Sequence, residues 1–138
     1  MFSLGLDDLL TELRRRQWTL LRWGPPDAPR LLAAMLHRET CADVLILRSE
    51  QDASAFRAPV WRGSDPLAPE KVSYQYHANA LWTLRAILTL PAPGSPGAPV
   101  TIETPHPRCR IGDHLPRPVL IRPLSPHPRA RPYQATVS

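Results

Sequence analysis

Leucines recur at helical spacing near the start of the chain, and charged residues flank them. The leucines lie three or four positions apart, or adjacent: Leu6, Leu9, Leu10 and Leu13. Acidic side chains come early in this stretch and Arg14–Arg16 come late, an order that complements the helix dipole at both ends. We therefore predict a helix over residues 4–16.

Aromatic and aliphatic residues then dominate residues 17–23, QWTLLRW. The segment Trp18–Trp23 could extend the helix or form a strand, and we favour a strand that ends at Gly24-Pro25-Pro26. After this turn Asp27 can cap a helix whose first turn tolerates Pro29. Four apolar residues would form the stripe of that second helix: Leu31, Leu32, Met35 and Leu36.

Two short apolar runs follow, and they read as a pair of strands. Residues 42–48, ADVLILR, form a continuous apolar run with β-branched members, which is typical of a buried strand. A polar turn leads from it into residues 54–60, SAFRAPV, which we expect to pair with it antiparallel. Pro59 then marks a sheet edge or a strand end.

Residues 72–90, VSYQYHANALWTLRAILTL, change character part-way. An extended start would place Tyr74 and Tyr76 on one face and His77 on the other. A helix over 78–88 would be apolar nearly all round, so we expect Trp82 and Leu84 in the core. Together these elements predict an α+β fold, a small mixed or antiparallel sheet with two to three helices on one face, followed by an extended Pro/Arg-rich C-terminal arm.

Prolines are concentrated in the C-terminal part of the chain. Six of the 18 prolines lie in residues 1–90 and twelve in residues 91–138. We therefore expect a folded α+β domain over 1–90 and a Pro/Gly linker over 91–99. An extended, partly docked segment would occupy 100–124, and a disordered basic tail 125–138.

Within the arm, the segment PRPVLIRPL (116–124) stands out because aliphatic residues lie between prolines. Its prolines exclude a helix, and the segment between them is too short for a central strand. It could lie extended in a groove or along a sheet edge, of this chain or of a partner. The residues predicted to bind a partner are Val119, Leu120, Ile121 and Leu124.

Charge is distributed as unevenly as proline. Residues 1–103 carry 11 basic and 11 acidic side chains, whereas residues 104–138 carry six arginines and one acidic residue, Asp113. The net charge of +5 therefore belongs to the arm, and it gives no reason to expect nucleic-acid binding by the folded body. An arginine-rich arm alone would give non-specific, salt-dependent affinity.

The polar residues Tyr74, Tyr76 and His77 form a possible polar site. They could line the rim of the core, belong to an interaction surface, or serve a small enzyme built around His77. A catalytic site needs a base and a nucleophile within reach, and no GxSxG, HExxH, P-loop or dinucleotide fingerprint occurs. We assign no catalytic residue and no cofactor.

Two cysteines and the absence of a signal segment bear on location. No secretory signal or membrane-spanning stretch is evident, so we expect a cytoplasmic protein with reduced thiols, Cys41 buried and Cys109 exposed. His106, Cys109 and His114 are closely spaced, but their spacing matches no zinc pattern. We expect no metal.

The segments CADVLILRSEQDASAFRAPV (41–60) and YQYHANALWTLRAILTLPAPGSPGAP (74–99) resemble parts of small uncharacterised actinobacterial proteins. The resemblance covers residues 18–110 approximately, implies a bacterial origin of that kind, and carries no activity or site. From the residues themselves we predict a non-catalytic interaction or adaptor module that uses its arm to bind a protein partner or itself. The alternatives are a nucleic-acid-associated protein with a non-specific basic arm, and an enzyme around His77.

Overall fold

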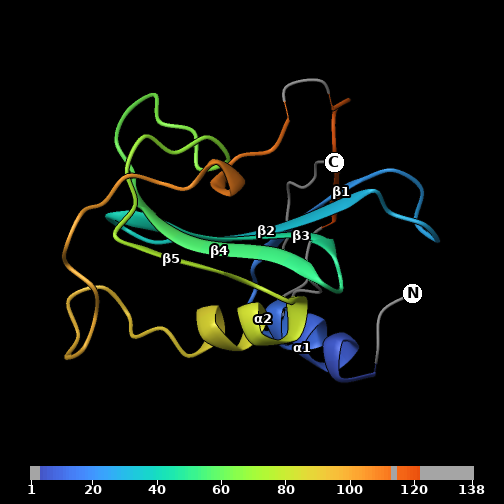
Figure 1. Ribbon diagram of the computed structural model, residues 1–138, viewed down its shortest axis with the longest axis horizontal. Helices are drawn as coiled ribbons and strands as arrows, with labels where there is room; N and C mark the ends of the chain where they lie inside the picture. The colour runs from blue at the N-terminus through green and yellow to red at the C-terminus, as the bar shows by residue number, and fades with distance from the viewer. Residues whose placement is uncertain (1–3, 113–114, 122–138) are drawn as a thin grey trace, which may run out of the picture.

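The computed structural model describes residues 4–112 and 115–121. They form an antiparallel sheet with two α-helices on one face, so the predicted α+β class is confirmed (Figure 1). Two to three helices were expected, and the described residues contain α1 and α2 with one turn of 3-10 helix, η1. The elements in chain order are α1 (Leu4–Arg15), β1 (Thr19–Trp23), β2 (Leu31–His37), β3 (Cys41–Ser49), β4 (Asp52–Pro59), β5 (Tyr74–Ala78), α2 (Ala80–Leu88), η1 (Pro107–Cys109) and β6 (Val119–Ile121).

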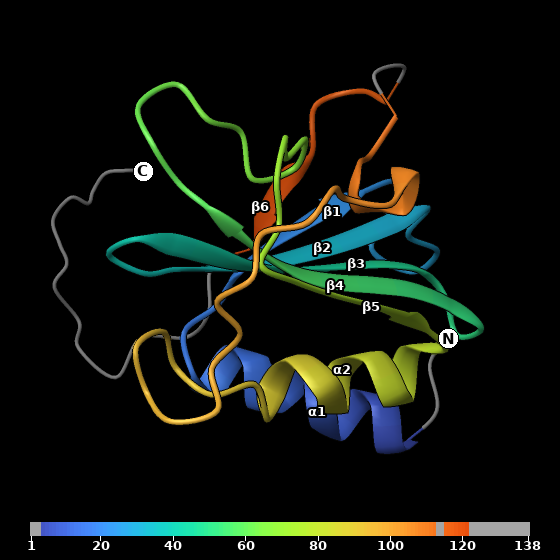
Figure 2. The ribbon, with the colours of Figure 1, turned by 60° about the vertical axis from the view of Figure 1, so that its left-hand side comes forward.

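The sheet is an antiparallel meander closed at one edge by a late strand. Its order is β5-β4-β3-β2-β1-β6. The first five strands follow one another in the chain, and β6 then returns to pair with β1 on the far side. Figure 2 shows α1 and α2 side by side beneath the sheet, with the connection between β4 and β5 and the segment around η1 above it, while the loop that follows α2 lies at the level of the helices. The sheet therefore lies between a helix layer and a layer of loops.

The expected second helix over residues 31–36 is wrong, because this segment is strand β2. Its side chains alternate between the two cores: Leu32 and Ala34 face the helices, whereas Leu31 and Ala33 face the loops. A strand apolar on both faces reads as a continuous run and imitates a helical stripe. Antiparallel pairing with β1 on one side and β3 on the other stabilises this segment as a strand rather than a helix.

The other expected elements near it are confirmed. The first helix ends at Arg15, and residues 19–23 form a strand rather than a helical extension. The strands expected at 42–48 and 54–60 are β3 and β4, paired antiparallel with Cys41 opposite Pro59. The apolar residues of β3 and β4 are divided between the two cores, because successive side chains of a strand point to opposite faces of the sheet.

Helix α2 begins where its sequence allows. The side chain of Asn79 accepts a hydrogen bond of 2.9 Å from the backbone N–H of Trp82, which caps the first turn. Leu84 is fully buried, as expected. The expectation that Trp82 lies in the core is wrong: 54% of this residue is exposed, and Arg85 stacks over its ring at 5.5 Å. A helix on a sheet presents one side to solvent, even when that side is apolar.

A buried ion pair lies among the apolar residues of the helix face. Asp43 on β3 and Arg57 on β4 are cross-strand partners, 1% and 2% exposed. The Arg57 guanidinium donates to the Asp43 carboxylate at 2.6 and 3.0 Å and to the carbonyl of Pro91 at 2.8 Å. Arg38 donates a further hydrogen bond of 3.0 Å to Asp43. This network joins the sheet to the segment that leaves α2.

The segment after α2 returns over the loop side of the sheet. Within this segment, Glu103 makes an isolated antiparallel bridge with Val72. Cys109 in η1 is 0% exposed and belongs to the loop-side core, so the expectation of an exposed Cys109 is wrong. Cys41 is buried as expected, and both thiols are unpaired. Neither helix of the described ranges is long and apolar enough to cross a membrane.

Candidate functional site

Strand β5 presents the residues of the predicted polar site on opposite faces of the sheet edge. Tyr74 packs on the helix-side core, and Tyr76 is 37% exposed. His77 lies opposite Ser54 in the register and forms a hydrogen bond with it, on the loop face. The predicted alternation of Tyr74 and Tyr76 against His77 is therefore confirmed, and the three residues do not form one constellation.

Gln75, the neighbour of His77 on the loop face, binds residues 103–109, the part of the chain that returns over the sheet after α2; we call it the returning segment. Its amide nitrogen donates to the Glu103 carboxylate at 2.6 Å and to the carbonyl of Thr104 at 3.1 Å. Its amide oxygen accepts from the backbone N–H of His106 at 2.9 Å and from the Cys109 thiol at 3.5 Å. One side chain thus holds four groups of a segment about thirty residues away.

The contacts of His77 assign its tautomer. Nε2 lies 3.2 Å from the amide oxygen of Gln75, and Nδ1 lies 2.8 Å from the hydroxyl of Ser54. The amide nitrogen of Gln75 donates to Glu103 and Thr104, so the amide oxygen is the atom that faces His77. An amide oxygen can only accept a hydrogen bond, and Nε2 of His77 therefore carries the proton. Nδ1 then accepts from the Ser54 hydroxyl. The network is complete with His77 neutral.

Basic side chains surround this neutral histidine. Arg48 donates to the Ser54 hydroxyl at 3.2 Å and to the carbonyls of Arg108 and Arg110 at 2.7 and 3.2 Å. The Arg108 guanidinium is paired with the Asp52 carboxylate. Burial, and after it the charges of His106, Arg108 and Arg48, hold the pKa of His77 below its ordinary value. The cluster resists protonation.

The cluster contains no activated nucleophile within the described residues. The Cys109 sulfur lies 4.0 Å from Nε2 of His77, but burial raises the pKa of this thiol to about 11. A protonated thiol is a poor nucleophile at neutral pH. Ser54 has a histidine within reach, yet it is 0% exposed and no substrate could approach its hydroxyl. The arrangement can position a segment of the chain; it lacks an accessible group for attack.

Other candidate groups are placed as follows. Among residues 4–112 and 115–121, no three His, Cys, Asp or Glu side chains are placed to hold a metal ion. His114 lies outside the described residues. A shallow depression lined by Asp52, His77, Asn79 and Arg108 lies beside the cluster. Sequence reasoning named His77 and, by alternation along β5, placed Gln75 on the same face, but it missed Ser54 and Arg48; the pairing of β4 with β5, which brings Ser54 to His77, has no local signal.

The predicted partner-binding segment lies at the opposite edge of the sheet. Val119, Leu120 and Ile121 form β6 and pair with Arg22, Leu21 and Leu20 of β1. Val119 is 48% exposed and Leu120 45% exposed, whereas Ile121 is half-buried. Leu124 lies outside the described residues. Comparison with protein-family models, curated proteins and solved structures finds no match to this chain.

The pKa of His77 predicts a loss of stability in acid. Because the folded state disfavours the charged imidazole, unfolding takes up a proton as the pH falls below the ordinary value of 6.5. Stability should be complete above this pH and should decline as the pH falls toward the lower pKa of the folded state. Urea unfolding of the wild type and of His77→Gln across pH 5–8 measures it.

His37→Gln, at an exposed histidine, is the matched control and should keep the wild-type pH dependence. His77→Gln should show a shallower decline, because the residue that takes up the proton is gone. Parallel pH curves for the wild type and His77→Gln would show that another group controls the acid response.

Proposed function

We propose that this chain is a non-catalytic protein-interaction module whose contact surface is the edge strand β6. The partner we propose is the β6 edge of a second copy. The observation that carries the proposal is an apolar strand at the end of the sheet order, with Val119 and Leu120 nearly half exposed. Exposed apolar edge strands present unpaired backbone groups and favour pairing with another chain.

The two edges of the sheet differ in a way that supports this choice. At strand β5 the returning segment binds Gln75 on the loop face, and just before the strand it bridges Glu103 to Val72. Strand β6 pairs with β1 on one side, and no described strand lies on its other side. The three residues of β6 carry no charge, and charged side chains are one of the devices that block edge pairing.

A second copy fits the geometry of this edge. Two identical edges can meet antiparallel about a two-fold axis, so that each copy contributes the same residues and the contact closes. Such pairing would continue the antiparallel sheet across both copies. We place this association in the cytoplasm, which the two unpaired thiols support.

The two alternatives draw less support from the described residues. The guanidinium of Arg108, one of the six arginines of the arm, is paired with Asp52, and the carbonyls of Arg108 and Arg110 accept from Arg48. These contacts stabilise the fold. Binding of nucleic acid would therefore depend on the other arginines of the arm. An enzyme around His77 would need an accessible nucleophile, and the burial of Ser54 and Cys109 speaks against one.

Leu120→Lys tests the proposal by placing a charge on the pairing edge. We expect the wild type to dimerise in sedimentation-velocity experiments, with an affinity that changes little with salt. Burying a leucine contributes about 1.5–3 kcal/mol, so the variant should dimerise at least about tenfold more weakly. Circular dichroism would verify that the variant remains folded.

Arg117→Gln is the matched control, because Arg117 is exposed and lies three residues before Leu120. It should dimerise like the wild type. A wild type that stays monomeric at every concentration would refute the proposal. So would an association that weakens steeply with salt and depends on Arg117 rather than on Leu120, which would favour the basic-arm alternative.

A further inference from the structure

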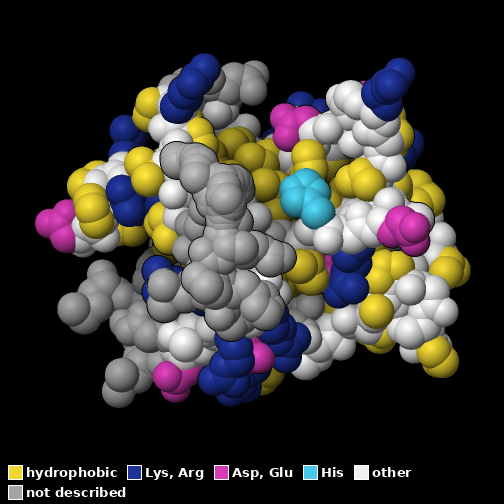
Figure 3. Space-filling view, turned by 180° about the vertical axis from the view of Figure 1, so that it is seen from behind, with side chains coloured by type: hydrophobic (Ala, Val, Ile, Leu, Met, Phe, Trp, Pro, Cys, Tyr) yellow, Lys and Arg dark blue, Asp and Glu magenta, His cyan; other side chains and the backbone are white. Residues whose placement is uncertain are grey.

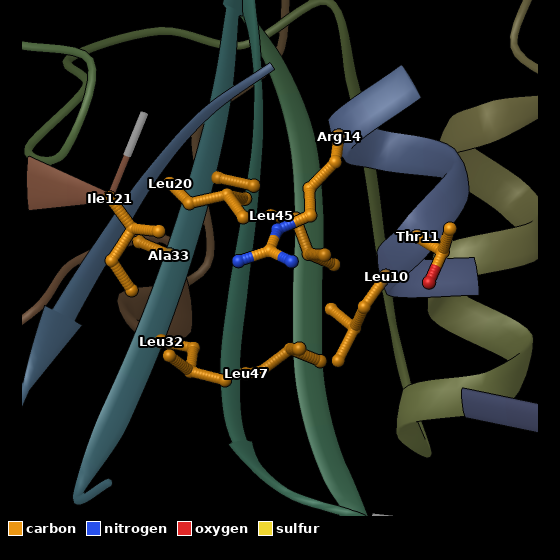
Figure 4. A pocket seen from close by; sticks show the side chains of 10 residues that line it. Leu10, Thr11, Arg14, Leu20, Leu32, Ala33, Leu45, Leu47 and Ile121 are labelled. Atoms are coloured by element: carbon orange, nitrogen blue, oxygen red, sulfur yellow. The ribbon is translucent and has the colours of Figure 1, made fainter. Parts of the chain in front are cut away.

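The helix layer leaves a hollow beside α1. A cavity of about 320 Å³ lies between this helix and strands β1, β2, β3 and β6 (Figure 4). Its walls are largely aliphatic and come from five different elements: Leu10, Leu20, Leu32, Leu45, Leu47 and Ile121. Its volume falls within the range of small-molecule sites, which are concave and mostly apolar with few polar groups. We call it the α1 groove.

One charged side chain reaches over this apolar surface. Figure 4 shows the Arg14 side chain leaving α1 and pointing toward the strands, with its guanidinium between the leucines of the groove. Its two neighbours are engaged elsewhere: Arg15 and Arg16 pair with Glu12 at 3.2 and 2.9 Å. The Arg14 guanidinium has no ion-pair or hydrogen-bond partner among the described residues.

Charged side chains of both signs lie near the groove. Seen from behind, Lys and Arg side chains gather together with Asp and Glu side chains on the helix side of the molecule (Figure 3). Arg16 is committed to the fold through a hydrogen bond of 2.9 Å to the carbonyl of Leu88, whereas Arg14 faces the groove. An occupant should therefore combine an apolar body with one negative charge at the position of Arg14.

We propose that the α1 groove binds a free aliphatic carboxylic acid of medium chain length, with the carboxylate on Arg14 and the chain against the leucines. A guanidinium offers a carboxylate two parallel hydrogen bonds, and these are strong when charge-assisted. The limited volume favours a medium chain over a long one. The chain beyond Ile121 is a poor occupant on charge, because Arg122, Arg129 and Arg131 would be brought toward Arg14.

This site is separate from the edge pairing proposed above, although Ile121 contributes to both. Val119 and Leu120 are outside the groove lining, and Arg14 is outside β6. A substitution at Arg14 therefore tests the ligand and leaves the pairing edge intact, and Leu120→Lys does the reverse.

Calorimetric titration of the full chain with decanoate tests the proposal, with decanol, decyltrimethylammonium and anionic phospholipid vesicles as comparison probes. Decanoate should bind in a single saturable site and more tightly than decanol. Arg14→Gln should weaken decanoate by about ten- to a hundredfold, the range for a hydrogen bond to a charged group, and should leave decanol unchanged. In that variant the preference for the carboxylate should disappear.

Arg15→Gln is the matched control on the same helix, since Arg15 is exposed and paired with Glu12. It should bind decanoate like the wild type. Equal weakening by both substitutions, a preference for decanol or the cationic amphiphile, or the absence of saturable binding would overturn the proposal. Binding to vesicles but not to decanoate would overturn it in favour of a membrane surface. Decanoate affinity that falls as protein concentration rises would assign the groove to a second copy and would equally overturn it.

Discussion

Replacing Asp43 by alanine should lower the free energy of unfolding by about 3–5 kcal/mol, the cost of leaving a buried charge without its partner. Arg57 is 2% exposed, and its guanidinium would lose two hydrogen bonds, of 2.6 and 3.0 Å. Burial acts to lower the pKa of Arg57, but the hydrogen bonds and charge of Asp43 outweigh it and raise this pKa. The carboxylate therefore compensates a charge that solvent cannot reach.

Urea unfolding of matched variants measures this effect. Glu12→Gln, which breaks the exposed pairs with Arg15 and Arg16, should cost less than about 1 kcal/mol. The double variant Asp43→Leu/Arg57→Met removes both charges and should regain much of the loss, because well-packed apolar residues often replace a buried pair without penalty. If Asp43→Ala cost no more than Glu12→Gln, the account of a dry ion pair would be wrong.

Leu84→Ala should cost about 2–5 kcal/mol, since it removes a fully buried side chain and leaves a cavity. Leu84 packs in the core between α2 and the sheet, with Leu45, Ala55 and Ile87 among the residues of the same cluster. Trp82→Ala, two residues earlier on the same helix, removes more atoms. It should nevertheless cost less, because 54% of Trp82 is exposed.

Thermal or urea unfolding of these two variants compares burial with size directly. A smaller loss for the leucine than for the tryptophan would contradict the orientation of α2 on the sheet. The comparison is informative because the periodicity of the sequence alone does not show which side of α2 is buried. The helix is apolar on most sides, and only the position of the sheet selects Ala80, Thr83, Leu84 and Ile87 as its buried face.

The elements that the sequence predicts well are those with local signals. Helix α1 follows from leucine spacing and flanking charges, and α2 begins directly after Asn79, whose side chain caps it. Strand β2 could not be separated from a helix, because Leu31, Leu32, Met35 and Leu36 satisfy both patterns. Its pairing with β1 and β3 is a non-local property that the stretch itself does not encode.

The candidate site shows the same division between local and distant information. Alternation along β5 predicted that Tyr74 and His77 lie on opposite faces. The partners of His77 come from elsewhere: Ser54 is 23 residues away, and Cys109 is 32. Their meeting depends on the register of β4 with β5 and on the path of the returning segment, and composition specifies neither.

The short apolar segment of the arm could be recognised from the sequence, but the strand with which it pairs could not. Val119, Leu120 and Ile121 lie between prolines in a basic stretch, which marked them as residues that should pack. In the structure they pair with β1, although Val119 and Leu120 stay substantially exposed. Leu124, Arg129 and Arg131 lie outside the described residues, so the expected binding role of Leu124 and the expected disorder of the tail stay predictions.

Hydrogen–deuterium exchange of the β6 amides, followed as protein concentration rises, tests the proposed edge pairing most directly. Pairing of two β6 edges would bond outward-facing backbone groups, so exchange over Val119–Ile121 should slow at high concentration. Exchange in the central strand β3 should stay constant, and the slowing should be absent in Leu120→Lys. Exchange over Val119–Ile121 that does not change with concentration, in a protein that nevertheless associates, would contradict β6 as the contact surface.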